Sequence, residues 1–150
     1  MYLIALSGGS IAERTKVAER LLAAARGRLN LCAQVNLTFS GKRRLIQLEG
    51  HHAVARAHSL AESLSGLDGP EMQGRGFVVA HCMTAEEAQV VRELNGVIWH
   101  IYSRPSGYVA IRKGDAIING DGGSFRHISC PIEALSDYLL ASRAQRPEVQ

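Results

Sequence analysis

The first 25 residues constrain the fold of this chain more than any other stretch. An apolar run of strand length, Tyr2–Leu6, leads into a Ser-Gly-Gly turn and then into an amphipathic helical pattern that ends near Ala25. A strand, a glycine turn and a helix form the frame of a phosphate-binding loop, in which backbone N–H groups and the helix N-terminus hold an anion. The same residues also fit an ordinary buried strand followed by a surface helix.

The complete phosphate-loop motif is G-x-x-x-x-G-K-[S/T], and this chain matches it only in part. Counted from Gly8, the motif agrees at Gly8 and Thr15, whereas Glu13 replaces the second glycine and Arg14 replaces the lysine. A glutamate brings a Cβ atom and a negative charge towards a polyanion, and an arginine lacks the compact ammonium group of lysine. The frame of an anion site is therefore present with altered chemistry.

Strand-like apolar segments alternate with helical patterns along the rest of the chain. The segments that we interpret as strands are 29–39, 76–82, 97–102, 108–112 and 115–119. The helical patterns cover 45–64, which Gly50 can divide, 85–94, which opens at a Thr84–Glu87 capping box, and 131–144. This alternation predicts an α/β fold, a mainly parallel sheet with helices on both faces. We expect one domain over 1–150 with a frayed tail at 145–150.

Parallel sheets bind ligands at the carboxyl ends of their strands, and three loops follow such ends here. They are Gly8–Ser10, His81–Met83 and Ser103–Arg104. We expect these loops to surround one crevice. His81 could titrate there, but a hydrogen-bonded histidine at the sheet rim is the more ordinary interpretation.

The composition fits a soluble globular protein: 46% of residues are apolar, 21% are charged, the net charge is +3 and the pI is near 9.0. A mildly basic chain suits a phosphate-bearing ligand, whereas nucleic acid is an unlikely partner because aromatic residues are few. The three cysteines form no CxxC pair and no apolar stretch reaches membrane-span length, so we expect a cytoplasmic protein without a membrane partner.

Metal binding is weakly indicated. His51 and His58 are two helical turns apart, with Glu62 as the one matching acid, and Asp121 lies in a Gly-Asp-Gly-Gly turn. A zinc site needs ligands at closer offsets, and turn chemistry explains the aspartate equally well. We assign no metal site.

Several spacings together resemble the phage-type deoxynucleoside monophosphate kinases, a branch of the P-loop kinases. The stretches that carry the resemblance are Leu3–Gly8, Phe39 with Lys42, Arg44–Gly50, Glu87-Ala88, Asn95–Ile101, Arg104-Pro105, Asp115–Asn119 and Glu133–Leu135. The resemblance runs over nearly the whole chain and implies a three-layer P-loop kinase fold. It also implies ATP and magnesium as cofactors if the chain is active.

This sequence differs from that family at positions where the family binds phosphate and magnesium. By the resemblance, Gly8, Gly9, Arg14, Thr15, Arg44 and Arg104 would hold nucleotide phosphates, with Thr15 on magnesium and Arg14 and Arg104 as catalytic cations. The family's D-x-R segment falls on His81 and Met83, which neither hold a magnesium-bound water nor grip a phosphate.

Two functions follow from these residues. The first is a catalytically inactive phage or prophage protein that binds a host or phage protein, a phosphate-bearing nucleotide or a second copy of itself. The alternative is an active, divergent nucleoside monophosphate kinase, which requires Glu13 to point away from the loop. Lys42 and Arg43 would add positive charge to the crevice in either case.

Overall fold

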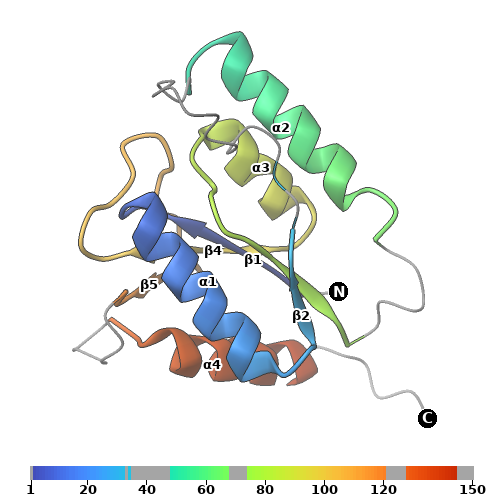
Figure 1. Ribbon diagram of the computed structural model, residues 1–150, viewed down its shortest axis with the longest axis vertical. Helices are drawn as coiled ribbons and strands as arrows, with labels where there is room; N and C mark the ends of the chain where they lie inside the picture. Colours follow the sequence, from blue (N-terminus) through green and yellow to red (C-terminus); the bar gives the residue numbers. More distant parts are fainter. Residues whose placement is uncertain (1, 33, 35–47, 68–73, 121–127, 145–150) are drawn as a thin grey trace.

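The computed structural model describes residues 2–32, 34, 48–67, 74–120 and 128–144 (Figure 1). In chain order the elements are β1 (Tyr2–Ser7), α1 (Ile11–Ala25), β2 (Leu29–Leu31), α2 (His51–Leu64), β3 (Gly76–Val79), α3 (Ala85–Glu93), β4 (Val97–Ile101), β5 (Ala116–Ile118) and α4 (Pro131–Ala144). Strands and helices alternate for most of this order, as the sequence predicted.

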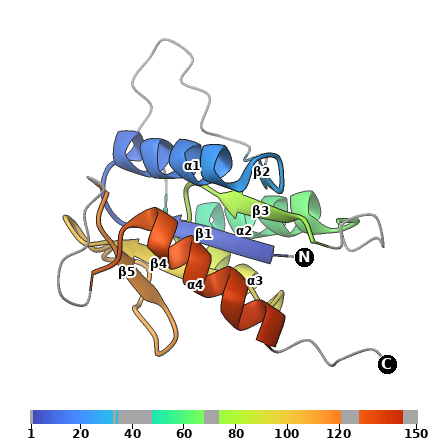
Figure 2. The same ribbon diagram turned by 90° about the horizontal axis from the view of Figure 1, so that it is seen from below.

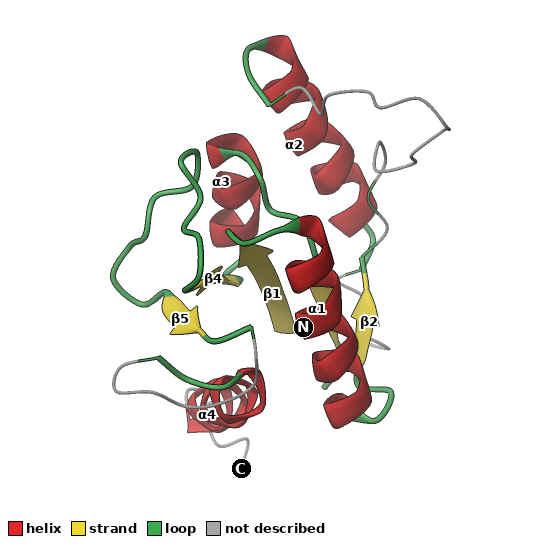
Figure 3. Cartoon of the chain, turned by 60° about the vertical axis from the view of Figure 1, so that its left-hand side comes forward, coloured by secondary structure: helices red, strands yellow, loops and turns green. Residues whose placement is uncertain are grey.

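The strands form one five-stranded sheet in the order β2-β3-β1-β4-β5, and every pair is parallel. Helices α1 and α4 pack against each other on one face, and α2 and α3 pack against each other on the opposite face (Figures 1 and 2). Figure 3 shows the same three layers with the sheet between the two helix pairs. The predicted α/β fold with helices on both faces is confirmed.

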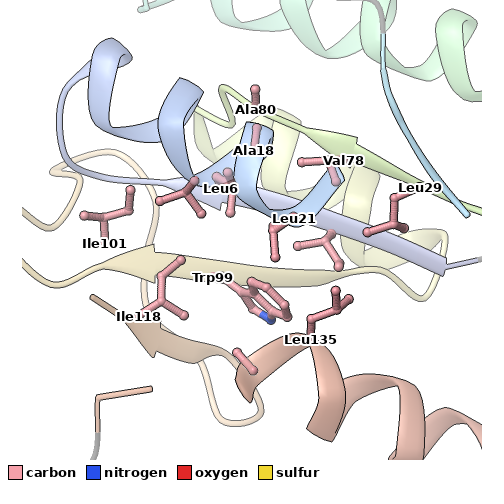
Figure 4. Packing of buried hydrophobic residues seen from close by; sticks show 13 residues of the cluster. Leu6, Ala18, Leu21, Leu29, Val78, Ala80, Trp99, Ile101, Ile118 and Leu135 are labelled. Carbon is pink, nitrogen blue, oxygen red and sulfur yellow. The ribbon is translucent and has the colours of Figure 1, made fainter. Parts of the chain in front are cut away.

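The central strand β1 supplies both halves of the core because its side chains alternate between the two faces of the sheet. Ile4 and Leu6 belong to the cluster under α1 and α4, and Leu3 and Ala5 belong to the cluster under α2 and α3. Figure 4 shows the first cluster, in which Trp99 lies between β4 and α4. β1 is therefore almost fully buried, which fixes the position of the loop that follows it.

Helix α3 begins directly after Thr84, as the sequence predicted, although the Glu87 carboxylate accepts from the Thr84 hydroxyl and not from the Thr84 N–H of a full capping box; the cap at the start of α1 was not predicted. Thr84 accepts a hydrogen bond from the backbone N–H of Glu87 at the start of α3, and Ser10 does the same for Glu13 at the start of α1. Such caps satisfy N–H groups that the helix itself leaves without partners. At α1 the cap includes the Glu13 side chain, which matters for the site described below.

Some predicted strands are shorter than expected, and one is absent. Residues 108–112 form no strand: the Ser106 hydroxyl accepts hydrogen bonds from the N–H groups of Tyr108 and Val109, in a local turn. β2 ends at Leu31, β3 ends at Val79 and α2 begins at His51, directly after Gly50. The predictions for Phe39, Lys42, Arg43, Arg44, Asp121 and the tail 145–150 lie outside the described residues.

Within the described parts of the chain, none of the helices combines the length and the apolar character that crossing a membrane requires.

Candidate functional site at the loop after the first strand

The three loops predicted to share a crevice do lie together. The backbone N–H of Gly9 donates to the Arg104 carbonyl at 2.7 Å, and the Ser103 hydroxyl donates to Glu13 at 2.7 Å. Arg14 joins α1 to His81, which follows β3, because its Nε donates to His81 Nδ1 at 3.1 Å. The prediction of a common crevice at the carboxyl ends of the strands is confirmed.

Arg14 lies inside the loop and not on its surface. Only 4% of the residue is exposed, and its Nη1 donates to the carbonyl oxygens of Gly8 at 2.7 Å and Gly9 at 3.0 Å. Burial lowers the pKa of its guanidinium, but an arginine keeps its charge inside a protein. The two glycines adopt positive φ angles of 79° and 61°, and in this conformation their carbonyls face a cation. A phosphate cradle needs the opposite polarity, N–H groups that face an anion.

Backbone N–H groups of the loop are also engaged within the protein. Gly9 donates to Arg104, and Ser10 donates its N–H to Glu13 Oε1 at 3.2 Å. The Glu13 N–H donates to Ser10 Oγ at 3.1 Å, which completes a capping box. Three of the donors that could hold an anion at this helix N-terminus, the N–H groups of Gly9, Ser10 and Glu13, are thus already paired with groups of the chain itself.

The Glu13 carboxylate faces the loop. Its Oε1 accepts from Ser10 and its Oε2 accepts from Ser103, so the carboxylate links the start of α1 to the loop after β4. The hydrogen bond from Ser103, followed by the one from Ser10, lowers the pKa of Glu13. A carboxylate at a helix N-terminus is also stabilised by the helix dipole. Glu13 therefore supplies a negative charge where a bound phosphate would have to place its own.

A buried ion pair that the sequence did not reveal lies behind the crevice. Arg56 of α2 donates its Nε to Glu87 of α3 at 3.0 Å, with side-chain exposures of 6% and 2%. The Thr84 hydroxyl donates to the same Glu87 oxygen at 3.0 Å. Arg56 also approaches the Met83 sulfur at 3.9 Å. The capping box had singled out Glu87, but no motif pointed to Arg56.

His81 accepts a hydrogen bond from the Arg14 guanidinium and is held neutral. Burial, followed by the positive charges of Arg14 and Arg56, lowers the pKa of His81 to about 4. Its backbone also forms a reciprocal pair with Gln34, whose amide accepts from the His81 N–H and donates to the His81 carbonyl, both at 3.0 Å. His81 thus serves as a hydrogen-bonded acceptor at the rim of the sheet, the ordinary interpretation of this residue.

The remaining predicted site residues are placed differently. The Thr15 hydroxyl donates to the Ile11 carbonyl at 2.8 Å, one turn back along the exposed side of α1, so it points along its own helix. Arg104 is exposed and lines a cavity of about 170 Å³ together with Gly8, Gly9 and Arg14. Ligand pockets for small molecules usually measure about 300–1,000 Å³. The described part of the crevice is therefore small for a nucleotide.

Among the described residues, no group of three or more His, Cys, Asp or Glu side chains could hold a metal ion. Burial raises the pKa of Cys32 and Cys82, and such thiols are inert.

No protein-family model matches this chain, and no curated protein matches it. The loop geometry is therefore the main guide to what this site does.

Proposed function

We propose that this protein is a catalytically inactive phage or prophage protein with a kinase-like fold, which acts by binding a host or phage protein. The observation that carries the proposal is the loop Gly8–Ser10. Its carbonyls hold the Arg14 guanidinium, and two of its N–H groups are bound by the Arg104 carbonyl and the Glu13 carboxylate. These two N–H groups are therefore occupied by the protein itself, and the carbonyls beside them face a cation instead of an anion.

Phosphoryl transfer depends on positioning and on charge neutralisation by the cradle, a lysine, a metal and arginine clamps. Removing one stabilising group of this kind typically costs about 3–4 kcal/mol of transition-state stabilisation. Here Arg14 is hydrogen bonded inside the protein, Thr15 is bonded to its own helix, and His81 and Met83 stand where the resemblance implies Asp and Arg. Together these changes support a binding function without turnover.

A second candidate is the binding of a phosphate-bearing nucleotide without turnover. Arg104 favours it, because its guanidinium is exposed at the crevice and forms no hydrogen bond or ion pair with the described residues. The third candidate, an active kinase that uses ATP and magnesium, requires Glu13 to leave Ser10 and Ser103 and turn outward. Its present hydrogen bonds speak against that alternative.

Calorimetry and thermal unfolding with Mg·ATP test the proposal, with a deoxynucleoside monophosphate as the second titrant. A ligand with a Kd of 10 µM stabilises a protein by about 2.7 kcal/mol when present at 1 mM. For a chain of this size that corresponds to a rise in Tm of about 5–11 °C. We expect no binding heat and a shift of less than 1 °C. Micromolar binding of both nucleotides followed by formation of ADP would overturn the proposal.

Variants at the crevice separate the second candidate from the first. If Mg·ATP binds without turnover, Arg104→Ala should weaken binding, while Arg112→Ala, which changes an exposed arginine outside the crevice, should not.

Sedimentation equilibrium of the purified protein tests self-association, since a symmetric dimer is the commonest assembly for such domains.

A further inference from the structure

A second concave surface lies at the opposite end of the sheet from the Gly8–Ser10 loop. It is a groove of about 740 Å³ between the end of α1, the first residues of β2 and β3, and α4. Leu29 and Leu135 form its buried floor, and Leu139 and the exposed Ile132 line it along α4. Tyr2, the first residue of β1, lines the groove, so about 20 Å of strand separates it from the loop.

Four arginines surround this apolar floor. Arg26, Arg28 and Arg75 stand on the side of α1, β2 and β3, and Arg143 stands on α4. All four are exposed, and none of their guanidinium groups forms a hydrogen bond or an ion pair with the described residues. No Asp or Glu is among the described residues that line the groove. We call this surface, defined by these arginines and the apolar floor, the arginine groove.

The backbone holds the arginines in place on one side of the groove. The Arg28 carbonyl accepts from Gly76 at 2.8 Å, and the Arg75 carbonyl accepts from Tyr2 at 3.0 Å. Arg26 ends α1 in the left-handed region, with φ 49° and ψ 52°. Glycine or asparagine adopts that conformation at lower cost than arginine. The backbone at Arg28 and Arg75 is therefore fixed by hydrogen bonds, and at Arg26 a cationic side chain stands at a position where local geometry favours another residue.

We propose that the arginine groove binds an acidic, amphipathic helix of a partner protein. The apolar face of such a helix would cover Leu29, Leu135 and Leu139, and its carboxylates would meet the arginines on both sides. Along α4 the groove runs from Ile132 to Arg143, a length of about 16 Å, which matches a helix of three turns. Arginine pairs carboxylates through two parallel hydrogen bonds, which adds orientation to the attraction.

The shape and composition of the groove favour a protein over other anions. A single aromatic residue, Tyr2, is among the described lining residues, whereas proteins that bind single-stranded nucleic acid offer several stacking platforms. A membrane surface is flat and favours a convex basic face, but here the arginines stand on two opposing sides of a hollow. This inference rests on the protein-binding part of the proposed function and names the chemistry of that partner.

Selection from a displayed library of random 16-residue peptides on the purified protein tests the inference. We expect the enriched peptides to carry net negative charge and apolar residues at helical spacing. Fluorescence anisotropy of the enriched peptides should show at least tenfold weaker binding to the double variant R28E/R75E. The matched control K16E/K113E makes the same change in net charge at exposed lysines outside the groove, and it should stay within threefold of the wild type.

Several results would overturn the inference. One is enrichment of neutral or basic peptides, and another is equal binding to both double variants. A third is the absence of acidic peptides together with arginine-dependent binding to phosphatidylglycerol vesicles or to a single-stranded oligonucleotide. If R28E/R75E unfolds, the salt dependence of peptide binding to the wild-type protein is the test. Its affinity for the enriched peptides must fall at least tenfold between 0.05 and 0.5 M NaCl, and a smaller fall would overturn the inference. Turnover of ATP would overturn the proposed function while leaving the peptide result intact, so the two failures are distinguishable.

Discussion

Arg56→Met should be among the most destabilising single changes in this protein. The substitution leaves the Glu87 carboxylate buried, with the Thr84 hydroxyl as its remaining side-chain donor in the part of the chain that the structure describes. Removing one partner of a buried ion pair costs about 3–5 kcal/mol, because a charge then remains in the interior without its counter-charge. Domains of this kind unfold with about 5–15 kcal/mol in total, so the variant would lose a large share of the stability.

Urea unfolding at pH 7 measures this loss. With an m value of about 2 kcal/mol/M, the midpoint of Arg56→Met should fall by about 1.5–2.5 M. The double variant R56M/E87L replaces both charges with apolar groups and should be more stable than Arg56→Met alone. His58→Ala is the control: it breaks a His58–Glu62 pair of similar length, 3.1 Å, whose side chains are 74% and 71% exposed. Exposed pairs of this kind contribute less than about 1 kcal/mol.

Two results would refute this reasoning. The first is a loss of less than about 1 kcal/mol for Arg56→Met, which would mean that water reaches Glu87 and that the pair is not desolvated. The second is additivity, with R56M/E87L losing the sum of the two single variants, since partners in one buried pair should be strongly coupled.

Two further predictions concern the crevice. Gly8→Ala should destabilise the protein by about 1–3 kcal/mol, because the φ angle of Gly8 is 79° and the new Cβ would lie 2.6 Å from the Arg104 carbonyl oxygen. Gly107→Ala is the control: its new Cβ would meet no atom within 4 Å, so the urea midpoint should change little. His81 has a folded pKa of about 4, lowered by burial and Arg14, against 6.5 in the unfolded chain. Between these values the unfolded state binds the extra proton, so stability should fall by a few kcal/mol from pH 7 to pH 4, and His81→Asn should flatten that part of the urea-midpoint profile.

Local signals in the sequence were sufficient for much of the fold. The last helix was predicted over 131–144, and α4 covers these residues because its apolar spacing and its opening proline act within a few turns. The Thr84–Glu87 cap was equally readable, since it involves residues three apart. The crevice followed from topology, because the carboxyl ends of parallel strands meet at one edge of a sheet.

Long-range contacts decided what the sequence could not. Arg14 points into the loop because it meets His81, 67 residues away, and nothing in the helix pattern favours that direction. The same holds for Arg56 and Glu87, which are 31 residues apart. Residues 108–112 contain the apolar side chains of a strand, yet Ser106 takes the N–H groups of Tyr108 and Val109 that a ladder would need.

Asp115 was predicted only as the start of a strand, and the structure gives it a structural role. Its Oδ2 accepts from Arg92 at 2.7 Å, lies 2.7 Å from His100 Nε2 and accepts the Arg112 N–H at 3.0 Å. These partners come from α3, from β4 and from the loop before β5. A local sequence pattern could not reveal this junction, because two of the three partners, Arg92 and His100, lie 23 and 15 residues away from Asp115.

The way Gly8 and Gly9 hold Arg14 limits how this protein could change by mutation. Arg14→Lys alone would place a shorter ammonium group where three hydrogen bonds now depend on a guanidinium. Glu13→Gly alone would remove the capping carboxylate while Arg14 still filled the loop. Each single step towards a phosphate cradle thus loses contacts before any anion could bind. A change from this loop to a phosphate-binding loop would therefore need at least two substitutions made together, because each one alone removes stabilising contacts.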